Sequence, residues 1–176
     1  METFLLVQDI PYLIAAQKLK SVIFLLTAFS KNERINILLA DDDVEDCEFF
    51  EEALGELDYK ANVSVVHNGE ELISFINKKD STQPDIIFLD INMPCMNGIE
   101  CLSELRKKKN MRNIPVVMFT TSSTRKDIET TYANGANLFL TKPNSIKELS
   151  KKVNKIFGLD WDLYPANNGI EKFVVK

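Results

Sequence analysis

The chain has 176 residues, an apolar fraction of 45% and a formal net charge of −5, values typical of one globular domain with a substantial core. An acidic chain is unlike the basic surfaces that bind nucleic acid, so direct nucleic-acid binding is disfavoured. The three cysteines, Cys47, Cys95 and Cys101, lack metal-ligand spacing, and we expect reduced thiols in a cytoplasmic protein. The single histidine, His67, excludes a histidine-rich metal site and is expected in an exposed loop after a strand.

Residues 1–34 predict a helical N-terminal extension, with Asp9 as a possible N-cap and Pro11 in the first turn. Its uninterrupted apolar part, residues 21–29, is too short to span a bilayer. Three interpretations stay open. The extension packs on its own domain or on a second copy, which we favour; it touches a membrane surface; or the recorded start lies upstream of the natural one.

From Ile35 onward, strand patterns alternate with helix patterns. Strands are expected in the ranges 35–40, 62–66, 85–90, 114–121 and 137–141. Helices are expected in the ranges 41–58, 69–79, 98–109, 124–136 and 145–158. Strict βα alternation predicts a parallel sheet covered by helices on both faces. The stretches "IIFL" and "PVVMF" are continuously apolar, as expected for strands that are buried on both sides.

Local signals fix several helix ends. Asp43 is expected to cap the first helix of the alternation, and Ser145 with Glu148 forms a capping-box pattern at the start of the last. Asn134-Gly135 is a typical C-cap. The acidic stretch 45–52 is interpreted as an exposed helical face, and the basic run 106–110 as a solvated helix end.

Polar side chains follow four of the expected strands. They are Asp41-Asp42-Asp43, Asp90 with Asn92 two residues on, Thr120-Thr121 and Lys142. Ligands bind at the carboxyl ends of strands in open α/β sheets, so these groups are expected to converge. Carboxylates stay ionised side by side only when a cation joins them, and hard oxygen ligands suit Mg²⁺. Lys142 and Thr120 suit a phosphate.

This arrangement predicts aspartyl-phosphate chemistry. Carboxylates can act as nucleophiles toward phosphorus, and Asp90 is the best placed because it stands alone at the tip of the central strand. Asn92 occupies the position where a second acid would speed hydrolysis, so an acyl phosphate is expected to persist.

The stretch from about Ile35 to Phe157 resembles the receiver domain of bacterial two-component response regulators. The motifs "ILLADDD", "FLDINMPCMNG", "MFTTS" and "FLTKP" carry the resemblance, in that order. Residues 120–145 are similar to stand-alone receivers related to the cyanobacterial phytochrome regulators. The resemblance implies a flavodoxin-like (βα)5 doubly wound parallel sheet with strand order 2-1-3-4-5. It implies a receiver domain at 35–158 and, at 159–176, a C-terminal tail with no output domain.

The resemblance also implies roles for the acidic residues. Asp90 resembles the phosphoacceptor. Asp42 resembles the direct Mg²⁺ ligand, and Asp41 acts largely through water. Asn92 supplies a backbone carbonyl to the metal.

The remaining motif residues resemble the switch of the family. Thr120 resembles the switch hydroxyl, Phe139 the aromatic switch and Lys142 the phosphate-binding lysine. Thr121 is slightly bulkier than the small residue that the family keeps there. The Lys142–Pro143 bond is expected to be cis, as is usual in the family.

The expected function is therefore that of a single-domain response regulator, a phospho-accepting signalling module and no turnover enzyme. A histidine kinase or phosphotransfer protein would donate the phosphoryl group. A downstream protein, or a second copy in a homodimer, would read the face made of the fourth helix, fifth strand and fifth helix of the alternation. Three alternatives are weaker. A phosphatase needs an acid at Asn92, a flavodoxin needs a glycine-rich phosphate loop, and a degenerate receiver would lack the Asp, Thr and Lys set.

Overall fold

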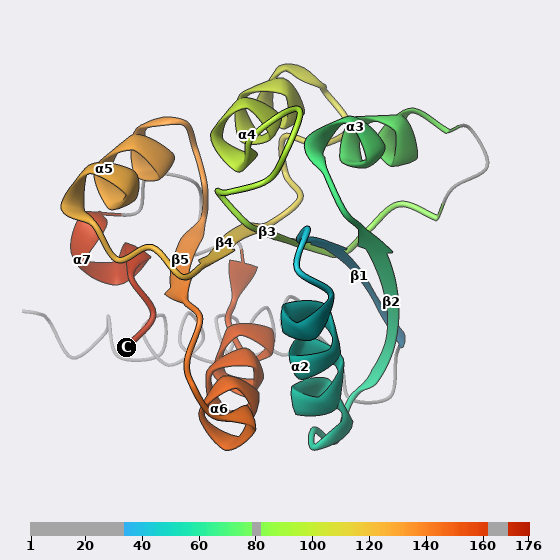
Figure 1. Cartoon of the computed structure of the whole chain (residues 1–176), viewed down its shortest axis with the longest axis vertical. Helices are drawn as coiled ribbons and strands as arrows, with labels where there is room; N and C mark the ends of the chain where they lie inside the picture. Colours follow the sequence, from blue (N-terminus) through green and yellow to red (C-terminus); the bar gives the residue numbers. More distant parts are fainter. Residues whose placement is uncertain (1–33, 79–81, 162–168) are drawn as a thin grey trace, which may run out of the picture.

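The computed structural model describes residues 34–78, 82–161 and 169–176, and the N-terminal extension expected at 1–34 lies, apart from Arg34, outside the described residues. The described chain forms a five-stranded parallel sheet with the order β2-β1-β3-β4-β5 (Figure 1). The strands are β1 (Arg34–Ala40), β2 (Lys60–Val66), β3 (Ile86–Leu89), β4 (Val116–Thr120) and β5 (Leu138–Thr141). The predicted doubly wound fold and its strand order are confirmed.

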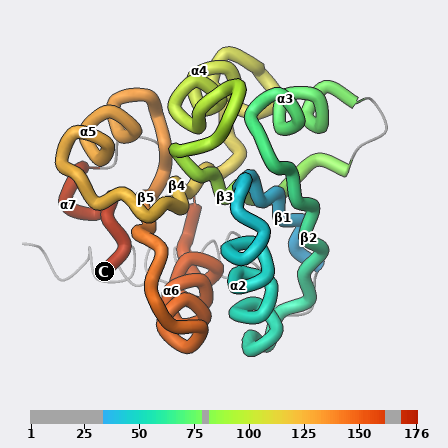
Figure 2. Tube along the Cα trace, viewed as in Figure 1, coloured from blue at the N-terminus to red at the C-terminus, as the bar shows by residue number. Residues whose placement is uncertain are grey.

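Helices cover both faces of the sheet. They are α2 (Val44–Gly55), α3 (Gly69–Asn77), α4 (Gly98–Lys107), α5 (Arg125–Ala133), α6 (Ile146–Phe157) and α7 (Ile170–Phe173). The tube view shows α3, α4 and α5 on one face and α2 with α6 on the other (Figure 2). No helix within the described ranges is long and apolar enough to cross a membrane.

Two hydrophobic clusters lie on opposite faces of the sheet. One contains side chains of α3, α4 and the strands, and includes Phe139 and Phe173. The other joins α2 to α6 and is built around Phe50, whose ring centroid lies 4.7 Å from that of Phe88 and 5.4 Å from that of Phe119. The central strands β3 and β4 are buried at every position, as their continuous apolar runs predict.

The predicted caps at Asp43 and at Asn134-Gly135 are borne out by the structure, whereas the capping box expected from Ser145 and Glu148 is only half formed. The Asp43 side chain caps α2 by accepting from the backbone N–H groups of Glu45 and Asp46. The Ser145 side chain accepts from the Glu148 N–H, while the Glu148 carboxylate pairs with Lys152 at 2.9 Å. Helix α5 ends at Ala133, and Gly135 follows with a φ of 89°, a conformation that favours glycine.

The expected cis bond between Lys142 and Pro143 is wrong, because every peptide bond of the described residues is trans. A trans bond before proline is the lower-energy form by about 0.5–1 kcal/mol. Lys142 reaches the carboxylates at the end of β1 with this trans bond in place, so nothing in the described loop demands the rarer isomer.

Two surface interpretations from the sequence need correction. The acidic stretch 45–52 is only partly exposed, since Cys47 and Phe50 are buried and Asp46 binds Lys142. In the basic run 106–110, Lys107, Lys109 and Asn110 are exposed as expected, but Arg106 is half-buried. Its guanidinium donates to four acceptors, namely the backbone oxygens of Met111, Ile114 and Gly135 and the Asn137 side chain.

The C-terminal tail, expected only as a segment without an output domain, packs against the domain at several points. Trp161 packs against the α2–α6 cluster. Beyond it, α7 lies against α5 and β5, and Phe173 is buried. Val174 forms a parallel β-bridge with Phe139, so the tail continues the sheet past its β5 edge.

Candidate metal and phosphoryl site

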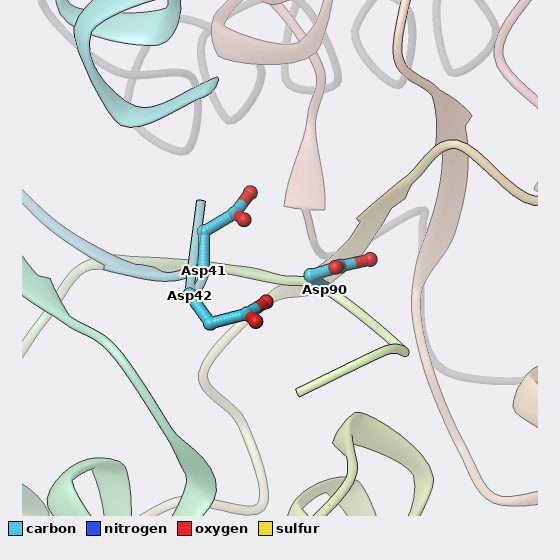
Figure 3. A group of neighbouring side chains, drawn as sticks. All are labelled: Asp41, Asp42 and Asp90. Carbon is cyan, nitrogen blue, oxygen red and sulfur yellow. The ribbon is translucent and has the colours of Figure 1, made fainter. Parts of the chain in front are cut away.

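Three carboxylates meet where β1 and β3 end. Ala40 and Leu89 are register partners in the parallel sheet, so Asp41 and Asp90 emerge side by side, and the Asp90 N–H donates to the Ala40 carbonyl at 2.9 Å. One oxygen from each of Asp41, Asp42 and Asp90 lies within 4.8 Å of the others (Figure 3). Asp41 and Asp90 are buried, whereas Asp42 is exposed to solvent at the mouth of the site. The convergence predicted from the strand ends is therefore found.

A single ammonium group neutralises part of this charge. Lys142 Nζ lies 2.7 Å from Asp41 Oδ2, 2.7 Å from Asp46 Oδ2 and 3.8 Å from Asp90 Oδ2. The Lys142 N–H donates to the Thr120 carbonyl at 2.8 Å, so pairing of β4 with β5 sets the position of the lysine. Asp46 was not predicted as a site residue, because one acid among many on a helix gives no pattern that singles it out.

Burial dominates the electrostatics of the innermost groups. Burial raises the pKa of Asp41 to about 6, although the hydrogen bond to Lys142 partly opposes this shift. Burial alone would lower the pKa of Lys142, but the hydrogen bonds to Asp41 and Asp46 outweigh it and raise the pKa. The lysine is therefore a permanent cation at neutral pH, and the site has an excess of negative charge.

Thr120 is the last residue of β4 and is fully buried. Its hydroxyl oxygen accepts a long hydrogen bond of 3.3 Å from the Ser122 N–H. The loop that follows is held by Asp127, which accepts hydrogen bonds from the Ser122 and Thr124 hydroxyls, and these bonds lower the pKa of the Asp127 carboxyl. The Thr120 hydroxyl is therefore held only weakly, although the loop of Ser122 and Thr124 beside it is firmly held, and it can form a new hydrogen bond.

The loop after β3 folds tightly around Asp90. The Ile91 N–H donates to Asp90 Oδ1 at 2.7 Å, and the Gly98 N–H donates to the Ile91 carbonyl at 3.0 Å. A Cβ at Gly98 would lie 1.9 Å from the Asp90 carbonyl oxygen, so only glycine allows this approach. Asn92 lies in the same loop with an exposed side chain.

Phe139 is the remaining residue that the sequence singled out. It lies in β5, opposite Met118 of β4, and is fully buried in the cluster on the α3–α4–α5 face. Phe139 does not belong to the carboxylate group. It lies in β5, three residues before Lys142, which directly follows the strand.

The donor set fits a small divalent cation. The oxygens of Asp41, Asp42 and Asp90 are hard ligands within one ion's reach of each other, and Asp42 opens the group to solvent. Their combined charge exceeds that of Lys142, so a cation would relieve the remaining repulsion. Sulfur and imidazole ligands are absent from this group, which disfavours zinc.

The chain is thus a parallel α/β protein with an acidic cluster and a lysine at the carboxyl edge of its sheet, and comparison with known families identifies which one. Residues 37–154 match the model of the response regulator receiver domain. The chain belongs to this family.

Relatives of this chain include two proteins named as regulators. Response regulator Rcp1 of Synechocystis sp. is 31% identical over 136 residues, which cover 74% of this chain and 92% of Rcp1. The probable methanogenesis regulatory protein FilR2 of Methanothrix harundinacea is 28% identical over 74% of this chain and 87% of its own. The solved structure of the phosphorylated cyanobacterial phytochrome response regulator RcpA superposes with a TM-score of 0.65 at 27% identity, covering 75% of this chain and 94% of RcpA. The predicted likeness to cyanobacterial phytochrome-associated regulators is confirmed.

Proposed function

We propose that this response regulator accepts a phosphoryl group on Asp90 from the phosphohistidine of a histidine kinase or a phosphotransfer protein in the cytoplasm. The single observation that carries the proposal is the grouping of Asp90 with Asp41, Asp42 and Lys142 at the end of β3. An Asp90 carboxylate oxygen attacks phosphorus and forms an O–P bond. The N–P bond of the donor breaks, and its electron pair stays on the imidazole nitrogen, which takes up a proton from solvent.

The proposed metal is Mg²⁺, held by the side chains of Asp41, Asp42 and Asp90 and by the Asn92 backbone carbonyl. When bound, it supplies positive charge against the oxygens of the transferring group. The structure of Rcp1 in a Mn²⁺-bound form superposes with a TM-score of 0.63 at 30% identity, covering 69% of this chain and 91% of that one, which supports a divalent cation here.

Lys142 and Thr120 are assigned to the phosphoryl group itself. Lys142 Nζ already lies 3.8 Å from Asp90, so a short movement brings it to a phosphoryl oxygen as a point charge. The Thr120 hydroxyl accepts a long bond from the Ser122 N–H, and its own O–H can donate a stronger, charge-assisted bond to a phosphoryl oxygen. A phosphoryl group on Asp90 carries nearly two negative charges where the free carboxylate carried one, and its oxygens reach further from the backbone, so it draws both groups inward.

The signal would leave through the face formed by α5, β5 and α6. Lys142 continues β5 and Thr120 ends β4, so their movement is transmitted directly to Phe139 and the neighbouring helices. A downstream protein or a second copy of the chain would bind this face.

A phosphatase is the competing function. It would use the same aspartyl-phosphate chemistry but needs a general acid near Asp90, and the position two residues on holds Asn92 with an exposed amide. Steady release of phosphate from small phosphoesters, with many turnovers per protein, would favour the phosphatase.

The proposal is tested by the intact mass of the full chain after incubation with acetyl phosphate and Mg²⁺. The wild type is expected to gain one phosphoryl group, and the chelator EDTA to abolish the gain. Asp90→Asn is expected to gain none. Asp43→Asn is the matched control, because it removes a neighbouring carboxylate that lies outside the cluster of Asp41, Asp42 and Asp90 and keeps a good N-cap for α2, so it is expected to gain one phosphoryl group. A gain that persists in Asp90→Asn would overturn the assignment.

A further inference from the structure

The last eight residues of the chain occupy the β5 edge of the sheet. The Val175 N–H donates to the Phe139 carbonyl at 2.9 Å, and Val174 forms the parallel bridge with Phe139. An exposed edge strand offers unpaired backbone groups to any extended segment that reaches it. In this chain the segment that reaches the edge is residues 169–176 of the same chain, as the red ribbon beside β5 shows (Figure 1).

Aromatic contacts hold the same segment on the helix side. The Phe173 ring lies 5.2 Å from the Tyr132 ring of α5 in a T-shaped arrangement and 6.1 Å from the Phe139 ring. The Gly169 N–H donates to the Tyr132 hydroxyl oxygen at 3.0 Å. Phe173 is thereby buried although it belongs to a four-residue helix.

The tail contacts both faces of the sheet beside β5, one on the α5 side and one on the α6 side. Val174 packs on the cluster of the α5 side, and Val175 packs on the cluster of the α6 side. A groove that includes Leu138 of β5 and Lys155 with Ile156 of α6 is lined on its other side by tail residues. The α5–β5–α6 face is therefore covered along its central strand.

We propose that residues 169–176, the C-terminal segment, are an intramolecular ligand of the α5–β5–α6 face and that phosphorylation of Asp90 releases them. The inference rests on the proposed function, because it concerns the face through which the phosphoryl signal leaves. While the C-terminal segment is bound, it blocks any partner that would pair with β5 or pack against Phe139.

The coupling follows from where the segment is anchored. Phe139 carries both the backbone bridge and one of the ring contacts, and Lys142, which a phosphoryl group on Asp90 would attract, lies three residues further on. Thr141 next to Lys142 is the register partner of Thr120, the other group drawn inward. Repacking of β5 at these points breaks contacts that the short segment cannot replace elsewhere, since such a small unit has little stability of its own.

Hydrogen–deuterium exchange of the full chain, read by mass spectrometry on the peptide that spans 169–176, tests both halves of the proposal. Without a phosphoryl donor, Phe173→Ala is expected to speed exchange in this peptide by about tenfold or more, because the ring contacts are lost. Ile170→Ala is the matched control on the same helix, since this side chain is 43% exposed, and it is expected to leave exchange near the wild-type rate.

With acetyl phosphate and Mg²⁺, the wild-type peptide is expected to exchange as fast as that of Phe173→Ala, and Asp90→Asn is expected to stay slow. If the wild type and Phe173→Ala exchange equally fast without a donor, the docking is overturned. If the wild type gains a phosphoryl group by intact mass and its tail stays slow, the release is overturned. If it gains no phosphoryl group, the proposed function fails and the release with it, while docking is still decided by the first comparison.

Discussion

Lys142 Nζ lies 2.7 Å from the carboxylate of Asp41, and this contact joins the continuation of β5 to the end of β1 across the central strands. The lysine side chain is 7% exposed and the aspartate is fully buried, so each charge depends on the other. The pair holds the lysine beside Asp90, where we propose that a cation and a phosphoryl group bind.

Lys142→Ala is expected to destabilise the metal-free protein by about 3–5 kcal/mol, because it leaves buried carboxylates without a counter-ion. Urea denaturation in the presence of EDTA measures the change. Lys107→Ala is the control, since its partner Glu104 and Lys107 itself are exposed, and it is expected to cost less than about 1 kcal/mol. Equal stability of Lys142→Ala and the wild type would contradict the buried ion pair.

The raised pKa of Asp41 predicts a pH dependence with a definite sign. The folded carboxyl has a pKa of about 6 against 3.8 for the free side chain, so the folded state binds the proton more tightly than the unfolded state. The stability of the metal-free wild type, relative to Asp41→Asn, is expected to fall as the pH rises from about 4 to 6. This relative stability is expected to fall by at most about 3 kcal/mol and to stay constant above pH 7.

Unfolding free energies of the two proteins in EDTA, measured at half-unit pH intervals, test this expectation. Subtracting the unfolding free energy of Asp41→Asn from that of the wild type removes the contribution of the other carboxyls. Several of these have lowered pKa values, such as Asp127 and Glu104. A difference that stays constant over this range would show that Asp41 does not titrate as proposed.

Gly98→Ala is expected to destabilise the fold by several kcal/mol and to slow phosphorylation, because the new methyl group would displace the backbone of Asp90. Gly55→Ala makes the same chemical change near the end of α2, where nothing lies within 4 Å of the added Cβ. It is expected to stabilise the protein by about 0.5–1 kcal/mol through helix propensity. Thermal denaturation and phosphoryl uptake from acetyl phosphate are measured for Gly98→Ala and Gly55→Ala. Similar effects of the two substitutions would argue against the close approach of Gly98 to the Asp90 backbone.

The cysteines differ in environment, and their reactivity is expected to follow. Burial raises the pKa of the Cys47 thiol to about 12 and that of Cys101 to about 11, whereas Cys95 is exposed. Native protein treated briefly with iodoacetamide at pH 8 is expected to gain one adduct by mass. Cys95→Ser is expected to gain none, and two adducts on native wild type would mean that the core opens more readily than the packing indicates.

The sequence predicted the fold well because its local signals agree with one another. The continuous apolar runs of β3 and β4 require burial on both faces, and the strand-end rule brings Asp41, Asp42 and Asp90 together.

What the sequence did not predict depends on contacts between distant segments. Asp46 joins the site only because α2 begins beside Lys142. Arg106 is hydrogen-bonded because two acceptors from the α4–β4 loop and two from the α5–β5 loop surround it. The stretch "FVV" at Phe173–Val175 carried a strand-like signal but was interpreted only as part of a tail. The isomer of the Lys142–Pro143 bond was carried over from a resemblance and is trans here.

The most direct test of the central proposal is to locate the acyl phosphate on the wild-type chain. Borohydride reduces an aspartyl phosphate to homoserine, and peptide sequencing by mass spectrometry then finds the altered residue. The account predicts homoserine at Asp90 alone. Homoserine at Asp41, Asp42 or Asp43, or a phosphorylated protein with no homoserine at Asp90, would contradict it.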